Sequence, residues 1–209
     1  MLTRIAVVFL CFWTGACAVG VQHRYDAIDA KIDATTDSSV SVAVVDARPY
    51  VVSGEKPAKF VGLSRGGFGN PFDVTTATDK PLAEDMTSAI VSAMNAQNVA
   101  AKPVLVSPGA TSEKALSEML KSNANRNVML ILFEWKADTY SSTALNYDVT
   151  LRIFDRTGRE RGKTRIDGRD NLGASAFNPP AHSRKVIPKA FKNKIEDLFS
   201  DPVIVRALK

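Results

Sequence analysis

The segment 127–133 constrains the fold of this chain more than any other. It reads Asn-Val-Met-Leu-Ile-Leu-Phe, a run of β-forming residues that is apolar on both faces. A strand of this kind needs cover on both sides or nearly so, and we predict it to lie centrally in a sheet. Residues 145–153 alternate apolar and polar side chains, which is typical of a half-buried strand. The very polar residues 159–170 suit an edge strand that is protected by charge.

The remaining patterns add three helices, a valine-rich strand and two shorter strand candidates, residues 59–63 and 99–106. Residues 39–46 alternate valine with small residues, and residues 50–52 are expected to extend the sheet. Helices are predicted from Asp79, as an N-cap, to residue 98, from residue 111 to 120, and from residue 183 to 199, where Pro188 argues for a kink or a later start. The order predicts an α+β fold with a single mixed, largely antiparallel sheet and helices packed mainly on one face.

The N-terminus has the pattern of a secretory signal. Arg4 precedes an apolar run over residues 5–13, and small residues 14–16 lead to Cys17. The run is too short for a permanent membrane-spanning helix, which needs about 20 apolar residues. We therefore predict a signal peptide over residues 1–16, a lipid-anchored tether over 17–38, and a single globular domain over 39–209.

Two peptidases fit the end of this signal. Gly15-Ala16-Cys17 resembles the end of a bacterial lipobox, in which the cysteine becomes residue one and carries lipid, palmitate included; Thr14 departs from the usual leucine. Cleavage after Ala18 also fits the A-x-A rule and would leave a soluble protein that begins at Val19. We favour lipidation of Cys17, because a cysteine directly after small residues at the end of an apolar run is otherwise uncommon.

Cysteine and histidine usage excludes several classes of site. The only cysteines, Cys11 and Cys17, lie in the signal region, so the domain has no disulfide and no thiol nucleophile. Zinc sites with cysteine ligands are excluded too, and His23 and His182 are too few for an expected metal site or catalytic triad. We predict no cofactor and no metal.

The C-terminal third of the chain is basic, with fourteen Lys/Arg against seven Asp/Glu from Arg152 onward. Such a bias usually marks a solvated face, and a membrane surface is the functional alternative. Nucleic acid is not an expected partner for an exported protein.

Three residues are candidate contacts for a partner or ligand: Arg48, Arg65 and Phe68. The glycine-rich loop 62–69 lacks the spacing of phosphate-binding loops, but it presents Arg65 and Phe68 at a loop tip. Asp46 and Arg48 share a strand face, which suits a carboxylate site or, as we favour, a structural ion pair that holds the following loop. No pair of carboxylates stands out as an acid/base pair, so we predict no catalytic residues.

Trp135, with Lys136 and Tyr140 nearby, could form an interfacial aromatic belt near lipid. We favour a role in packing at the sheet edge.

The stretch Val44-Val-Asp-Ala-Arg-Pro-Tyr50, the glycine loop and the helix over 79–98 resemble, in layout, the YajG-like lipoproteins of bacterial envelopes. That layout is a signal, a tether, a strand with Val-Asp near its end, a helix, a strand, two or three antiparallel strands and a closing helix. The resemblance implies an envelope lipoprotein without established catalysis. Ala18 stands where inner-membrane lipoproteins of enteric bacteria carry Asp, so the outer membrane is the expected destination by analogy.

These observations predict a non-enzymatic, membrane-tethered domain in the periplasm that binds or scaffolds another envelope component. Its expected partners are the membrane, through lipid on Cys17, and an envelope protein. The alternative is a soluble periplasmic binding module, cleaved after Ala18, with a ligand near Arg65. A hydrolase that uses Asp46 or Asp73 is the less favoured third reading.

Overall fold

The sheet is built around one long strand, β6 (Arg126–Thr139). The computed structural model describes residues 20–32 and 38–209, and within them eight strands form a single mixed sheet. Residues 128–132 of β6 are all buried, and neighbouring strands pair with both of its edges. The prediction of a central strand is confirmed, and β6 continues past the apolar run to Thr139.

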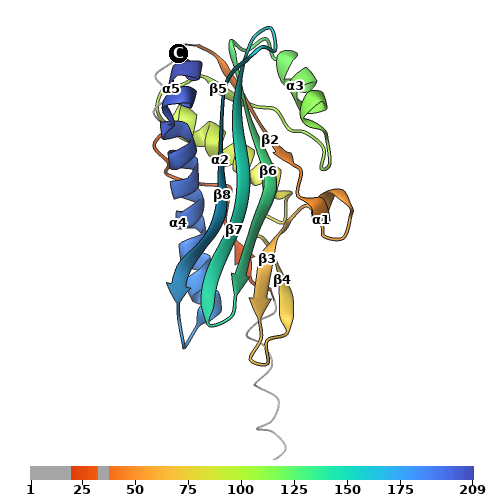
Figure 1. The fold of residues 1–209 in the computed structure, drawn as a ribbon, viewed down its shortest axis with the longest axis vertical. Helices are drawn as coiled ribbons and strands as arrows, with labels where there is room; N and C mark the ends of the chain where they lie inside the picture. Colours follow the sequence, from red (N-terminus) through yellow and green to blue (C-terminus); the bar gives the residue numbers. More distant parts are fainter. Residues whose placement is uncertain (1–19, 33–37) are drawn as a thin grey trace, which may run out of the picture.

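The other strands flank β6 unequally. They are β1 (Gln22–His23), β2 (Val40–Asp46), β3 (Phe60–Arg65), β4 (Pro71–Thr76), β5 (Ala101–Pro103), β7 (Ser142–Asp155) and β8 (Glu160–Ala174). On one edge, β7 and then β8 add as long antiparallel ladders (Figure 1). On the other edge, β2 pairs in parallel with the first half of β6, and β3 pairs in parallel with its second half.

The exchange of β2 for β3 along this edge depends on Gly62. A Cβ atom at this position would overlap the carbonyl oxygen of Ala137 in β6, so no other residue allows the two strands to approach so closely. Register shifts at residues 60–62 of β3 and 132–134 of β6 accompany the exchange.

Short ladders complete the sheet. β5 adds in parallel to β2, β4 pairs antiparallel with β3, and β1 adds in parallel to β4. The sheet is therefore mixed, and its two longest ladders are antiparallel, as predicted.

The helices cover the two faces of the sheet to different extents. They are α1 (Pro49–Val52), α2 (Leu82–Asn95), α3 (Ser112–Leu120), α4 (Pro179–Ser200) and α5 (Pro202–Leu208). The larger core lies under α2, α4 and α5, and a smaller one lies under α3 on the opposite face. Side chains of β2 alternate between the two cores: Val42 and Val44 enter the larger, Ala43 and Val45 the smaller. The α+β fold class with helices mainly on one face is confirmed.

The domain begins earlier than predicted. Residues 20–32 were expected to be tether, but they contain β1, and Val21, Tyr25, Ala30 and Ile32 are buried in the larger core. The tether prediction is wrong for these residues. Their inward side chains alternate with polar ones in two short runs, residues 21–25 and 28–32, but the composition, rich in Ala and Asp, is typical of a tether.

Two further elements also differ from prediction. Residues 50–52 form the short helix α1 with Pro49 at its first position, where proline is preorganised for a helix, rather than a strand. Asp79 does not cap α2: it has a φ of 63° and pairs with Lys59, and the helix begins at Leu82.

Helix α4 runs without interruption through Pro188. Proline inside a helix costs about 3 kcal/mol, and the burial of Ile187 and Phe191 on either side of it offsets that cost.

Cys17 lies outside the described residues, so the predicted lipidation is not addressed by the structure. Among the described residues, no helix combines the length and the apolar character needed to cross a membrane.

Candidate functional site

The end of β2 carries a buried ion pair between Asp46 and Arg48. The Arg48 Nε donates to Oδ1 of Asp46 at 2.8 Å, and Nη2 donates to Oδ2 at 2.7 Å. The two side chains are 1% and 0% exposed, respectively. Burial disfavours the charged guanidinium, but the hydrogen bonds and charge of Asp46 outweigh it, so the pKa of Arg48 is raised.

The other N–H groups of Arg48 bind backbone carbonyls from two further segments. Nη1 donates to the carbonyl oxygens of Phe60 (2.6 Å) and Trp135 (3.3 Å), and Nη2 donates to that of Ala58 (3.2 Å). A guanidinium has five N–H groups, and all five have partners within the protein. Arg48 therefore joins β2, β3 and β6 where β3 replaces β2, and no donor is left for a ligand. The structural ion pair favoured from the sequence is confirmed.

Tyr50 and Glu134 extend this cluster toward the surface. The Tyr50 hydroxyl donates to Oε1 of Glu134 at 2.6 Å, and the Arg48 guanidinium lies 5.5 Å from the Tyr50 ring centroid. Burial raises the pKa of Tyr50, which keeps the hydroxyl protonated as a donor. Sequence reasoning missed this pair, because the partners are 84 residues apart and only the fold brings them together.

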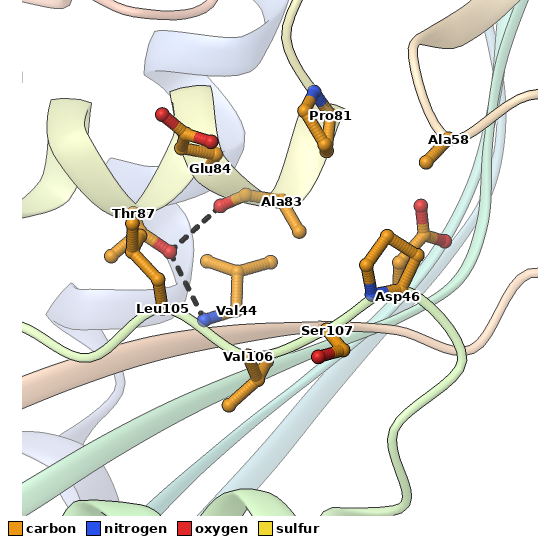
Figure 2. Close-up of a pocket in the computed structure, with 11 residues that line it drawn as sticks. Val44, Asp46, Ala58, Pro81, Ala83, Glu84, Thr87, Leu105, Val106 and Ser107 are labelled. Atoms are coloured by element: carbon orange, nitrogen blue, oxygen red, sulfur yellow. Dashed lines mark hydrogen bonds between the residues drawn. The ribbon is translucent and has the colours of Figure 1, made fainter.

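A small pocket lies beside the ion pair (Figure 2). It occupies about 120 Å³ outside the end of β2, against the first turns of α2 and the segment after β5. This is the edge at which open α/β sheets bind ligands, next to the carboxyl ends of parallel strands. Its lining residues are Val44, Asp46, Ala58, Pro81, Ala83, Glu84, Thr87, Leu105, Val106, Ser107 and Pro108.

The pocket has little capacity for chemistry. The Thr87 hydroxyl donates to the Ala83 carbonyl at 2.7 Å and accepts from the Val44 amide at 3.2 Å, as the dashed lines in Figure 2 show. Glu84 pairs with Lys80, and Asp46 pairs with Arg48. Ligand pockets usually measure roughly 300–1,000 Å³. This one accepts at most a few waters or one small apolar group.

The two carboxylates of the hydrolase hypothesis are not joined in one site. Asp46 is buried against Arg48, whereas Asp73 lies on β4 with its side chain 43% exposed and pairs with Lys56 at 2.8 Å. Each carboxylate is held by a different cation. An exposed ion pair of this kind does not favour acid/base chemistry at Asp73.

Arg65 and Phe68 lie far from the buried pair, at the hairpin between β3 and β4. Arg65 donates through Nε and Nη2 to both carboxylate oxygens of Asp138, at 2.8 and 2.7 Å. Phe68 is 99% exposed. The structure thus separates the three candidate contacts: Arg48 is enclosed in the protein, and the other two are at the surface.

His23 is a buried polar residue that sequence reasoning assigned to the tether. It is 1% exposed, and its Nε2 lies 3.3 Å from the Ser183 hydroxyl of α4. Burial, with a smaller contribution from Arg184, lowers the pKa of His23 to about 4. His23 is therefore neutral at physiological pH where the N-terminal segment meets α4.

Trp135 belongs to the core. It is 2% exposed and makes edge-to-face contacts with Tyr25 and Phe191. The packing role favoured from the sequence is confirmed, although the residue lies deeper than a sheet edge.

Across residues 20–32 and 38–209, no three His, Cys, Asp or Glu side chains gather in an arrangement that could hold a metal ion.

Neither protein-family models nor curated protein sequences gave a match. Among solved structures, the chain is similar to the protein XCC0632 of Xanthomonas campestris, described with the family DUF330, with a TM-score of 0.55, 11% identity, and coverage of 88% of this chain and 96% of that one. An uncharacterised protein (TM-score 0.49, 9% identity, 91% and 99% coverage) and lipoprotein GNA1162 of Neisseria meningitidis (TM-score 0.29, 12% identity, 77% and 99% coverage) are also similar. Only the first score exceeds 0.5, and at 11% identity it shows a shared fold alone.

Proposed function

We propose that this chain is a non-enzymatic domain of the bacterial cell envelope, anchored by lipid on Cys17, that binds or scaffolds another envelope component. One observation carries the proposal: the N-terminus has the pattern of a secretory signal that ends in Gly15-Ala16-Cys17, and Val21, four residues later, is already buried in the core. A lipid on Cys17 would hold the domain against the membrane, with almost no free chain between the two.

The geometry of the Asp46 cluster supports the non-enzymatic part. Asp46 and Arg48 are bound to each other, and the adjoining pocket of about 120 Å³ is small. The layout shared with YajG-like lipoproteins supports a place in the envelope, and Ala18 after the cysteine supports the outer membrane.

The test is the intact mass and detergent partition of the protein expressed with its own signal. We expect the native chain to carry lipid mass and to enter the detergent phase, and a Cys17→Ser variant to lose both. Cys11→Ser is the matched control, since it removes the other cysteine but leaves the site of modification. An unlipidated native chain would disprove the anchor.

The second candidate is a soluble periplasmic binding module that begins at Val19. The sequence Ala16-Cys17-Ala18 favours it, because it fits the ordinary peptidase. The same mass measurement separates the candidates: a chain that starts at Val19 and stays in the aqueous phase supports the soluble module.

A further inference from the structure

Three loops at one end of the molecule expose aromatic side chains. Phe68 in the β3–β4 hairpin is 99% exposed, Phe177 between β8 and α4 is 100% exposed, and Tyr140 in the β6–β7 turn is 49% exposed. Single exposed apolar residues are common on protein surfaces. Two fully exposed phenylalanines at the same end require a more specific explanation.

These loops form one continuous surface, which we call the aromatic tip (residues 66–70, 140–141 and 175–178). The Tyr140 hydroxyl donates to the Gly67 carbonyl at 3.3 Å, which joins the first loop to the second. The Ser175 amide donates to the Ser141 carbonyl at 3.2 Å, which joins the second to the third. In Figure 1 the β3–β4 hairpin and the lower ends of β6, β7 and β8 lie together at the bottom of the view.

The N-terminal segment enters the fold from the side of this tip. β4 starts beside the hairpin at Pro71, and β1 runs parallel to it, with Gln22 opposite Thr75. Gly20 therefore lies back toward the hairpin. Three residues of chain span at most about 10 Å, so Cys17 lies within that distance of Gly20.

The charge at this end suits a membrane that contains anionic lipid. The three loops of the tip contain no charged residue. Arg65, at the base of the hairpin, is matched by Asp138. The first two turns of α4 add Arg184 and Lys185, both exposed. Arg184 and Lys185 have no ion-pair partner among residues 20–32 and 38–209. An uncharged aromatic surface beside such cations fits the headgroup region, where aromatic side chains are favoured and Lys/Arg attract anionic lipids.

We propose that the aromatic tip is the membrane-contacting surface of this protein, with Phe68 and Phe177 inserted among the headgroups of anionic phospholipids. The proposal rests on the anchor at Cys17 for its orientation. The fourteen residues of β7 extend about 48 Å at the usual rise per residue. The opposite end of the sheet is therefore beyond the reach of the short link to Cys17, and it faces away from the bilayer.

The first experiment places a fluorescent probe at the tip. Phe68→Trp and, as a control, Phe133→Trp are introduced separately into the mature full chain. Each variant is bound to phosphatidylglycerol vesicles with brominated acyl chains, and the quenching of its tryptophan fluorescence is measured. Phe133 is a 43% exposed phenylalanine on β6, six residues and about 20 Å from the end of that strand at Thr139. Trp135 is common to all samples, so the unsubstituted chain gives the background.

We expect the tryptophan at position 68 to be quenched at least about twofold, because its ring reaches the boundary between the headgroups and the brominated acyl chains, and the tryptophan at position 133 to match the background. If the tryptophans at positions 68 and 133 of a lipidated protein were both quenched only to the background level, the aromatic tip would not contact the membrane. The proposal of a lipid anchor would be unaffected.

The second experiment tests the tip without the lipid. Vesicle binding of the Cys17→Ser chain is compared with that of the same chain carrying Phe68→Ser and Phe177→Ser, and with a control carrying Val52→Ser and Leu105→Ser, two exposed apolar residues outside the tip. We expect the tip variant to lose about tenfold in affinity for phosphatidylglycerol vesicles, from the loss of buried apolar area, and the control to bind as before.

The two experiments keep the proposals apart. An unlipidated chain would disprove the lipid anchor on Cys17. The second experiment would still test whether the aromatic tip contacts the membrane. Unchanged vesicle binding of the tip variant overturns the membrane contact. A change in its oligomeric state on sizing, with vesicle binding unchanged, assigns the tip to a protein contact instead and also overturns it.

Discussion

Two Asp–Arg pairs in this molecule have nearly identical geometry and different surroundings. Asp46–Arg48 and Asp138–Arg65 each join Nε and Nη2 to the two carboxylate oxygens at 2.7–2.8 Å. The first pair is enclosed at the meeting point of three strands, whereas the side chains of the second are 35% (Arg65) and 26% (Asp138) exposed.

The difference shows that geometry alone does not determine what an ion pair does. In the interior, desolvation makes each charge dependent on its partner, and removing one partner leaves the other uncompensated. At the surface, water solvates whichever charge remains, and the net contribution is small. The sequence predicted both arginines as candidate contacts, and only Arg65 is open to solvent.

The largest effect is expected from Arg48→Met. It removes the partner of Asp46 and leaves the carbonyls of Ala58, Phe60 and Trp135 without their donor. The free energy of unfolding should fall by about 3–5 kcal/mol, measured by urea denaturation at pH 7. A loss under about 1 kcal/mol would mean that this pair behaves like a surface pair.

His23 extends the comparison to a buried group with no counter-charge. Its pKa is about 4 in the fold, against 6.5 for an unperturbed histidine. Between pH 6.5 and pH 4 the imidazole is protonated in the unfolded chain but stays neutral in the fold. The contribution of His23 to the free energy of unfolding is therefore fully present above pH 6.5 and falls by about 3 kcal/mol as the pH drops toward 4.

The measurement is urea denaturation of the native chain and of His23→Gln from pH 7.5 to pH 4.5. The variant should lack this part of the pH dependence, and His182→Gln, at the other histidine, should retain it. The same slope in the native chain and His23→Gln would contradict burial of a neutral imidazole.

Tyr50→Phe tests the partly buried rim of the cluster. The change removes the hydroxyl that donates to Glu134 at 2.6 Å and leaves the ring in place. Because Glu134 remains partly accessible to water, we expect a loss of about 1–2 kcal/mol in the free energy of unfolding. Thermal denaturation beside Tyr140→Phe, whose hydroxyl is at the surface, provides the matched comparison. Equal melting temperatures for the two variants would argue against the role of this hydrogen bond.

The smallest effect is expected from Arg65→Met, the surface counterpart of Arg48→Met. Its urea midpoint should equal that of the native chain within experimental error, since water replaces the Arg65 guanidinium as the partner of the Asp138 carboxylate. A shift comparable with that of Arg48→Met would remove the distinction between the two pairs.

The main sheet was predictable because its residues carry the signal locally. The apolar run before Phe133 and the alternation from Leu145 to Ile153 fix β6 and β7 without reference to the rest of the chain. Val21, Tyr25 and Ile32 were not assigned in this way: their alternating runs are short and are interrupted at residues 26–27, and their burial depends on α4 and on a sheet made by residues far along the chain.

The site was predictable to the same limited extent. The spacing of Asp46 and Arg48 indicated an ion pair, but the carbonyls that complete the coordination of Arg48 come from β6 and from the region of β3. Phe68 was singled out from its loop. Phe177 was not, because only the pairing of β7 with β8 brings its loop next to Tyr140.

The central position of β6 has a consequence for how the molecule folds and opens. Its first half completes a ladder with β2, 86 residues earlier in the chain, and its second half does the same for β3. Closing loops of this length is entropically slow, so we expect folding to be limited by the docking of this one strand. Once it is docked, β6 joins β2 and β3 to β7 and β8, so the two sides of the sheet separate only when a ladder of β6 breaks. Its amide hydrogens should therefore exchange with solvent only through global unfolding.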